Sequence, residues 1–227
     1  ILVDVGVTFP TMDGTPGVDL IMADTAYIEA RADRLEAMDV PAYKIGSGEC
    51  NNYPLIKHIA AFAKPVILST GMNSVESVGK AVSIFRKHNI PYALLHCTNI
   101  YPTPPHLVRL GGMTRLQKEF PDAVVGLSDH TNDIHASIGA VCLGAKVIEK
   151  HFILNRTLKY KNGELSPDVQ FSLEPHEFAE LVRCVRNTET ALGTINYELT
   201  EKAKKSREFS RSLYITEDIK SGEELTE

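Results

Sequence analysis

Two histidines, His130 and His151, have the residue type and the setting to bind a metal ion. Each follows a short apolar run, Val124–Leu127 for the first and Lys146–Ile148 for the second, and charged residues precede each histidine. Imidazoles at the ends of neighbouring strands can share one divalent ion and leave coordination positions for water and substrate. A single histidine is more often structural than metal-binding. The pair predicts a metal site because both histidines lie at the ends of neighbouring predicted strands.

Lys44 is a cation within another predicted strand, Ala42–Ile45, and Gly46-Ser47-Gly48-Glu49 follows it. A lysine in such a position is costly to bury without an anion, and phosphate or carboxylate is the natural partner. A Schiff base is the other chemical use of such a lysine, and a strand-end lysine that reaches water is the structural alternative. The glycines let backbone N–H groups approach a ligand closely.

Two further patterns concern the ends of predicted strands. Asn99 and Tyr101 follow the strand Tyr92–Cys97, where an amide and a phenol suit a polyhydroxylated ligand, or where the asparagine only initiates a turn. Side chains alternate between the two faces of a strand. If His151 faces the interior of the protein, Glu149 therefore faces the interior as well and Lys150 faces outward.

The elements that must position these residues alternate between β-rich apolar runs and helical patterns. The predicted strands are Val18–Met22, Ala42–Ile45, Pro65–Ser69, Tyr92–Cys97, Val124–Leu127 and Lys146–Ile148. The predicted helices are Ile28–Met38, Leu55–Phe62, Ser74–His88, His106–Glu119, Ile134–Leu143 and Pro175–Leu192. This rhythm is typical of a parallel sheet covered on both faces, as in a doubly wound sheet or a closed barrel.

Polar residues past nearly every predicted strand favour the barrel, because all strand ends meet at one mouth there. The fold class is therefore α/β, with a TIM (β/α)8-type barrel that lacks its first one or two βα units. The opening segment Ile1–Gly17 has one apolar stretch followed by Thr11–Gly17, which reads as loop, and it can hold one degenerate unit at most.

Composition limits the partners of the protein. The net charge is −5 with scattered basic residues, which argues against nucleic acid as the main partner. No apolar run approaches the ~20 residues that a membrane-spanning helix needs, so no membrane partner is expected. The widely spaced cysteines form no CxxC pair, which favours reduced thiols in a cytoplasmic protein.

Several long motifs resemble the N-acetylneuraminate (sialic acid) synthase family. They are the segments Lys44–Ile56, Leu68–Met72, Leu95–Thr103, Gly126–Thr131 and Glu149–Phe152. The match runs in register from about residue 19 to 192. The resemblance implies a transferase that condenses phosphoenolpyruvate with an N-acylated hexosamine such as N-acetylmannosamine. Carbon 3 of phosphoenolpyruvate attacks the open-chain aldehyde, water adds at carbon 2, and phosphate leaves.

The resemblance also implies a role for each matching residue. His130 and His151 match the ligands of a divalent metal, Mn²⁺ or Mg²⁺, that polarises the aldehyde. The residues that match phosphoenolpyruvate contacts are Thr25, Lys44, Ser47, Asn99 and Ser128. Glu49, Tyr101 and Asp168 match sugar-side groups, and Glu49 and Lys44 are the candidate catalytic residues. The loop Asn155–Ser166 is longer than the corresponding loop of the family, which lies beside the sugar.

The resemblance divides the chain into three parts. Residues 1–195 form the synthase barrel with an incomplete N-terminal part, residues 196–211 form a linker, and residues 212–227 start a truncated antifreeze-like domain. In the family this domain caps the active site of a partner subunit, so a homodimer is expected of the full-length protein. Two other hypotheses remain: a pyruvate aldolase that uses Lys44 as a Schiff base, and an inactive truncated barrel that only binds ligand or a partner chain.

Overall fold

The chain folds into two compact units, Ile1–Leu192 and Gly193–Glu227. The computed structural model describes residues 2–4, 25–157, 159, 162–194, 196–212, 214 and 216–224. The strand expected at Val18–Met22 lies outside the described residues. Among the described helices, none combines the length and the apolar character that crossing a membrane requires.

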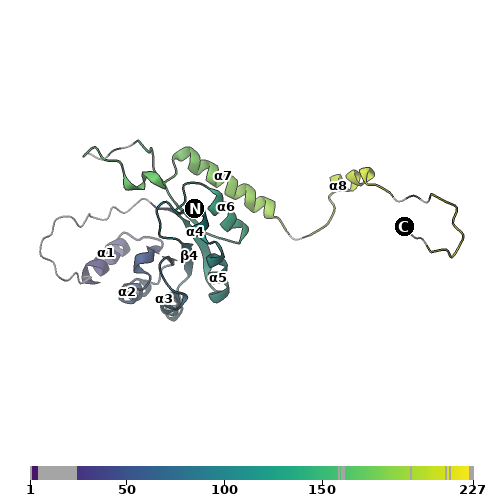
Figure 1. Ribbon diagram of the computed structural model, residues 1–227. Helices are drawn as coiled ribbons and strands as arrows, with labels where there is room; N and C mark the ends of the chain where they lie inside the picture. Colours follow the sequence, from purple (N-terminus) through teal and green to yellow (C-terminus); the bar gives the residue numbers. More distant parts are fainter. Residues whose placement is uncertain are drawn as a thin grey trace. The chain divides into compact units, whose positions relative to one another are not determined.

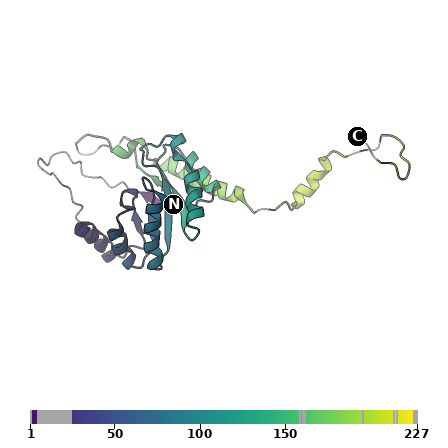
Figure 2. The same ribbon diagram turned by 60° about the horizontal axis from the view of Figure 1, so that its bottom comes forward.

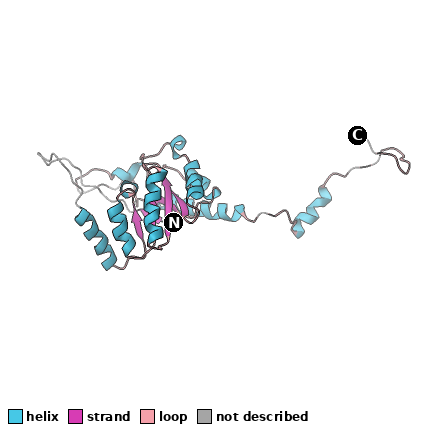
Figure 3. Ribbon diagram, turned by 90° about the horizontal axis from the view of Figure 1, so that it is seen from below, coloured by secondary structure: helices cyan, strands magenta, loops and turns pink. Residues whose placement is uncertain are grey.

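A parallel sheet lies at the centre of the first unit, with helices along its outside (Figures 1 and 3). The strands are β1 (Leu2–Asp4), β2 (Tyr43–Ile45), β3 (Val66–Ser69), β4 (Tyr92–Cys97), β5 (Val124–Asp129) and β6 (Ile148–His151), in the order β1-β6-β5-β4-β3-β2. The helices are α1 (Thr25–Ala37), α2 (Tyr53–Ala61), α3 (Val75–Lys87), α4 (Pro105–Val108), α5 (Gly111–Glu119), α6 (His135–Cys142) and α7 (Pro175–Leu192). Neighbouring helices α1, α2 and α3 stand side by side (Figure 2).

One ion pair shows that the sheet curves as a barrel does. Three strands separate β2 from β6, so a flat sheet would hold them about 19 Å apart. Lys44 on β2 nevertheless lies with its Nζ atom 2.6 Å from Oε2 of Glu149 on β6. The two side chains meet across a concave face, which excludes the flat doubly wound alternative. The expected barrel architecture is present as a curved, partial barrel.

The apolar stretch at the N-terminus contains a short strand. Leu2–Asp4 form β1, which pairs in parallel with β6 so that Asp4 lies opposite His151. The loop expected at Thr11–Gly17 lies outside the described residues. Strand β1 extends the sheet on the side of β6 that faces away from β5.

The helices begin where the sequence provides caps. The Asn52 side chain accepts a hydrogen bond from the amide of Leu55 at the start of α2, and Ser74 accepts one from the amide of Ser77 at the start of α3. The apolar faces of these helices cover the sheet, with Ile56 and Phe85 fully buried. Each such side chain contributes about 1.5–3 kcal/mol to folding by leaving water.

The boundaries of several elements differ from the sequence prediction. The segment His106–Glu119 was expected as one helix, but Arg109 adopts a left-handed backbone with φ of 52° and separates α4 from α5. Strands β5 and β6 continue past their expected ends, because their ladder runs through the pair of Asp129 and Lys150 and His151 then pairs with Asp4 of β1. His151 therefore ends a strand instead of following one.

Asp122 anchors the turn between α5 and β5 to the neighbouring α3 and β4. It accepts hydrogen bonds from Arg86 and from the Tyr92 hydroxyl, the latter at 2.7 Å. The Arg86 guanidinium holds the pKa of Asp122 well below its ordinary value. Burial raises the pKa of Tyr92 to about 12, so this phenol keeps the proton that it donates.

This cluster predicts a specific pH dependence of stability. Because the folded-state pKa of Asp122 is depressed, its contribution is complete above the unfolded-state pKa of about 3.9 and is lost as the pH falls further. We expect Asp122→Asn to lower the free energy of unfolding by about 1 kcal/mol at pH 7, since the pair is half exposed. Urea unfolding at a series of pH values measures this, and the difference should shrink below about pH 4. Glu198→Gln, at an exposed position outside this cluster, is the control with the same charge change. A difference that stays constant down to pH 3 would contradict the assignment.

The second unit contains a short helix, α8 (Glu201–Ser206), within the expected linker. Thr200 caps it by accepting a hydrogen bond from the amide of Ala203 at 3.2 Å. A single 3-10 turn, Arg207–Phe209, follows. The antifreeze-like domain expected at residues 212–227 stays a prediction.

Candidate active site

A continuous chain of polar contacts crosses the concave face of the sheet. Lys44 Nζ lies 2.8 Å from Glu149 Oε1, and the Ser128 hydroxyl donates to the same carboxylate oxygen at 2.6 Å. The Ser128 oxygen in turn lies 3.3 Å from Nε2 of His130. These contacts connect the expected anion-binding lysine on β2 with the expected metal ligand after β5. The structure therefore brings the two halves of the predicted site into one place.

The alternation expected along β6 is confirmed. Glu149 is buried on the concave face against Lys44, and the Lys150 side chain is buried on the opposite face against Asp129. The alternation with His151 predicts that Glu149 lies on this face, but no sequence pattern predicts a role for it in the site. Its partner could not be found from spacing, because Lys44 is brought to it only by the curvature of the sheet.

A second cluster surrounds Ser47 in the 3-10 turn Ser47–Glu49 that follows β2. Its hydroxyl accepts a hydrogen bond from the Gly71 amide at 3.1 Å and lies 2.9 Å from the Cys97 sulfur. That sulfur lies 3.4 Å from Oδ1 of Asn99. The expected phosphoenolpyruvate contacts Ser47 and Asn99 thus lie together. No sequence pattern predicts that Cys97 belongs to this cluster, where burial raises the pKa of its thiol.

The histidine pair lies at the end of β5 and β6, with ring centroids 5.4 Å apart. His130 Nδ1 donates to the Thr98 carbonyl at 2.8 Å, since a carbonyl oxygen can only accept. Burial lowers the pKa of His130, which favours the neutral ring. The Ser128 hydroxyl donates its hydrogen to Glu149 and not to His130. The lone pair on Nε2 of His130 is therefore available to a metal ion.

This arrangement fits a bound divalent ion. A histidine ligand that donates its second nitrogen to a backbone carbonyl is the usual way in which proteins orient a metal-binding imidazole. No cluster of three or more His, Cys, Asp or Glu suited to a metal occurs among the described residues. An ion held here would have the two imidazoles as its protein ligands, and water or substrate oxygens would complete the coordination.

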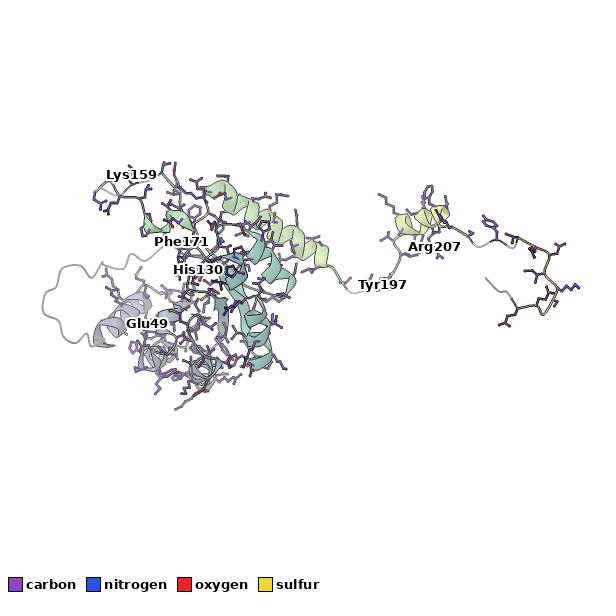
Figure 4. All side chains as sticks on the ribbon, viewed as in Figure 1. Glu49, His130, Lys159, Phe171, Tyr197 and Arg207 are labelled. Atoms are coloured by element: carbon purple, nitrogen blue, oxygen red, sulfur yellow. The ribbon has the colours of Figure 1, made fainter. Side chains whose placement is uncertain are left out.

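Aromatic rings cover the histidine pair. The Tyr101 ring lies 4.3 Å from His130 and 5.1 Å from Phe171, measured between centroids. Phe171 packs edge-on against His151 at 4.8 Å, and Figure 4 shows Phe171 and His130 at the same end of the sheet. Tyr101, which is expected as a sugar-side residue, thus lies beside the histidine pair. Phe171 was missed, because it comes from an irregular segment with no periodic signal.

The other expected site residues are placed less directly. Glu49 ends the 3-10 turn and accepts a hydrogen bond from Asn52 at 2.7 Å, and within the described part of the chain it makes no hydrogen bond to the histidines. Asp168 lies in the 3-10 turn Pro167–Gln170, which leads directly to Phe171. The backbone of Thr25 begins α1, and its side chain lies outside the described residues.

Comparison with known proteins agrees with this fold. The model of the NeuB family matches residues 14–197. The pseudaminic acid synthase of Campylobacter jejuni is 42% identical over 194 residues, which cover 85% of this chain and 54% of that protein. The human N-acetylneuraminate-9-phosphate synthase is 39% identical over 171 residues, which cover 75% of this chain and 46% of that protein.

A solved structure extends the agreement to three dimensions. The N-acetylneuraminic acid (sialic acid) synthetase of Leptospira borgpetersenii superposes with a TM-score of 0.69 at 33% identity, covering 78% of this chain and 60% of that one. The fold places the protein in the class of β/α-barrel proteins, and the histidine pair lies at the ends of its strands. The chain belongs to the NeuB family. It spans about half the length of the curated relatives that it matches.

Proposed function

We propose that this protein condenses phosphoenolpyruvate with an N-acylated hexosamine to give a nonulosonic acid and phosphate. The observation that carries the proposal is the chain of contacts from Lys44 through Glu149 and Ser128 to His130. It joins a cation suited to a phosphorylated donor to imidazoles suited to a metal that activates an aldehyde. The synthase names of the relatives support the same reaction class.

The donor side of the site consists of Lys44 with the cluster around Ser47. In the structure Glu149 neutralises Lys44, and a trianionic donor would compete with this carboxylate for the ammonium group. The hydroxyls of Ser47 and Ser128 and the amide of Asn99 add fixed polar contacts, which hold a charged donor without reorganisation. Thr25 completes this set in our proposal.

The acceptor side consists of the histidine pair and the rings over it. We assign Mn²⁺ or Mg²⁺ to His130 and His151, and when bound such an ion polarises the aldehyde oxygen. Tyr101 covers the pair and would exclude water from one side of the aldehyde. In our proposal Glu49 and Asp168 contact the sugar, and Glu49 holds or moves a proton at the hydroxyl groups of the sugar.

The condensation is tested by the mass of the product. The chain is incubated with phosphoenolpyruvate, Mn²⁺ and each of several N-acylated hexosamines, and products are measured by mass spectrometry. We expect phosphate release that requires both the sugar and the metal, and a product whose mass equals the sugar plus pyruvate. Binding of donor and metal without any product would instead support the ligand-binding alternative.

Gly71 provides a prediction for the donor side. A Cβ atom at this position would lie 1.9 Å from Asn99 Oδ1 and 2.6 Å from the Cys97 sulfur. We expect Gly71→Ala to displace both groups and to raise the KM for phosphoenolpyruvate about tenfold, in keeping with the cost of overpacking. Gly111→Ala in α5 is the matched control, because no atom lies within 4 Å of its added Cβ and the residue is not part of the donor side. Equal KM values for the two variants would show that the cluster around Ser47 does not bind the donor.

A further inference from the structure

The most buried cation of the described chain is not part of the proposed chemistry. Lys150 on β6 has a fully buried side chain on the face of the sheet opposite to Glu149 and His151. Its Nζ atom lies 3.1 Å from Asp129 Oδ2. A buried ion pair of this kind gives little net stability, because desolvating both charges offsets their attraction. Its presence therefore calls for another role.

The remaining contacts of Lys150 all go to the loop that follows β5. Its ammonium group donates to the Thr131 carbonyl at 2.5 Å, to the Thr131 hydroxyl at 3.1 Å and to the Asp133 carbonyl at 2.9 Å. A single cation thus fixes two carbonyls of a segment that has no regular structure. Asp129 fixes the same segment from the other side, since its carboxylate accepts the Thr131 amide at 2.9 Å.

His130 lies between Asp129 and Thr131, and Lys150 contacts both of these residues. Asp129 precedes it in β5 and Thr131 follows it, while Lys150 directly precedes His151 in β6. Asp129 and Lys150 also face each other in the ladder of the two strands. The Ser137 hydroxyl of α6 donates to Asp129 at 2.7 Å and ties the pair to the helix layer. The far face of the sheet therefore carries a brace across the two strands that bear the histidines.

We propose that Lys150 is a positioning residue that sets the spacing of His130 and His151 for their shared metal ion, by holding the backbone on both sides of His130. The inference rests on the proposed function, because it presumes that this pair binds the metal. Removing the ammonium group frees the loop while leaving both imidazoles in the chain. Metal affinity therefore falls even though no metal ligand is lost.

The test measures Mn²⁺ binding by electron paramagnetic resonance of free Mn²⁺, with no substrate present. We expect Lys150→Met to weaken Mn²⁺ binding by about 10–100-fold, as loss of a residue that orients a ligand does. The double variant Lys150→Met/Asp129→Asn removes the unpaired buried charge and keeps the polar contacts of the Asp129 position. It should recover thermal stability but not Mn²⁺ affinity. Lys80→Met, which removes an exposed ion pair on α3, is the control and should bind as the wild type does.

The outcomes separate this inference from the proposed function. If the double variant regains wild-type Mn²⁺ affinity, or if Lys150→Met never loses it, Lys150 only balances charge and the inference is wrong. If the wild type itself shows no Mn²⁺ binding that depends on His130 and His151, the metal site of the proposed function fails and the inference falls with it. A Co²⁺ visible spectrum that changes in both Lys150 variants, with the fold intact by circular dichroism, would support altered ligand geometry.

Discussion

Replacing His130 with glutamine is expected to abolish most of the metal-dependent turnover, lowering kcat/KM roughly 10³-fold. Loss of the metal's contribution to polarising the aldehyde is worth several kcal/mol in the transition state. Glutamine keeps a hydrogen-bonding side chain of similar reach beside Tyr101, so the aromatic cover should persist. Steady-state kinetics of phosphate release, together with Mn²⁺ affinity, measures the effect.

His96→Gln is the matched control for this prediction. His96 also lies on a strand and contacts a backbone carbonyl, that of Val108 at 2.8 Å, but it faces α5 in the helix layer. We expect its turnover to remain within about threefold of the wild type. Equal losses in the two histidine variants would mean that the effect comes from folding and would contradict a metal role for His130.

The second large effect is expected from Lys44→Met. Removing the ammonium group takes away the principal cation of the donor side, and loss of one such preorganised contact costs about 10²–10³-fold in rate. The variant also leaves the buried Glu149 carboxylate without its partner. Because the Lys44 side chain is 29% exposed, we expect a stability loss of about 1–3 kcal/mol, below that of a fully buried pair.

Lys44→Arg separates the two chemical uses of this lysine. An arginine keeps the charge and can still bind phosphate, so it should restore part of the lost activity if Lys44 binds the donor. It cannot form a Schiff base, so a completely inactive arginine variant, joined to borohydride trapping of pyruvate on the wild type, would favour the aldolase alternative. Lys57→Met on the exposed side of α2 is the control and should leave kinetics unchanged.

The sequence predicted those parts of the site that local patterns specify. The histidines and Lys44 were found because each ends or interrupts an apolar run, and the inward direction of Glu149 followed from alternation with His151. The barrel was preferred on the same grounds, since polar residues at the ends of successive strands must meet.

The parts that escaped prediction depend on tertiary geometry. The contact of Lys44 with Glu149 joins strands far apart in the sheet order, and only the curvature of the sheet creates it. Phe171 reaches His151 because Leu173 pairs with Phe152 beyond β6, a bridge without a periodic signature. The break between α4 and α5 requires a left-handed Arg109, which a helical pattern does not reveal.

The most direct test of the central claim follows one oxygen atom. Phosphoenolpyruvate labelled with ¹⁸O at the oxygen that bridges carbon 2 and phosphorus is given to the chain with Mn²⁺ and the accepted N-acylated hexosamine. If water adds at carbon 2 and phosphate then leaves, the label must appear in inorganic phosphate, at a rate that falls in the His130 and Lys44 variants. Label retained in the sugar product, or phosphate release that needs neither the sugar nor these two residues, would contradict the account.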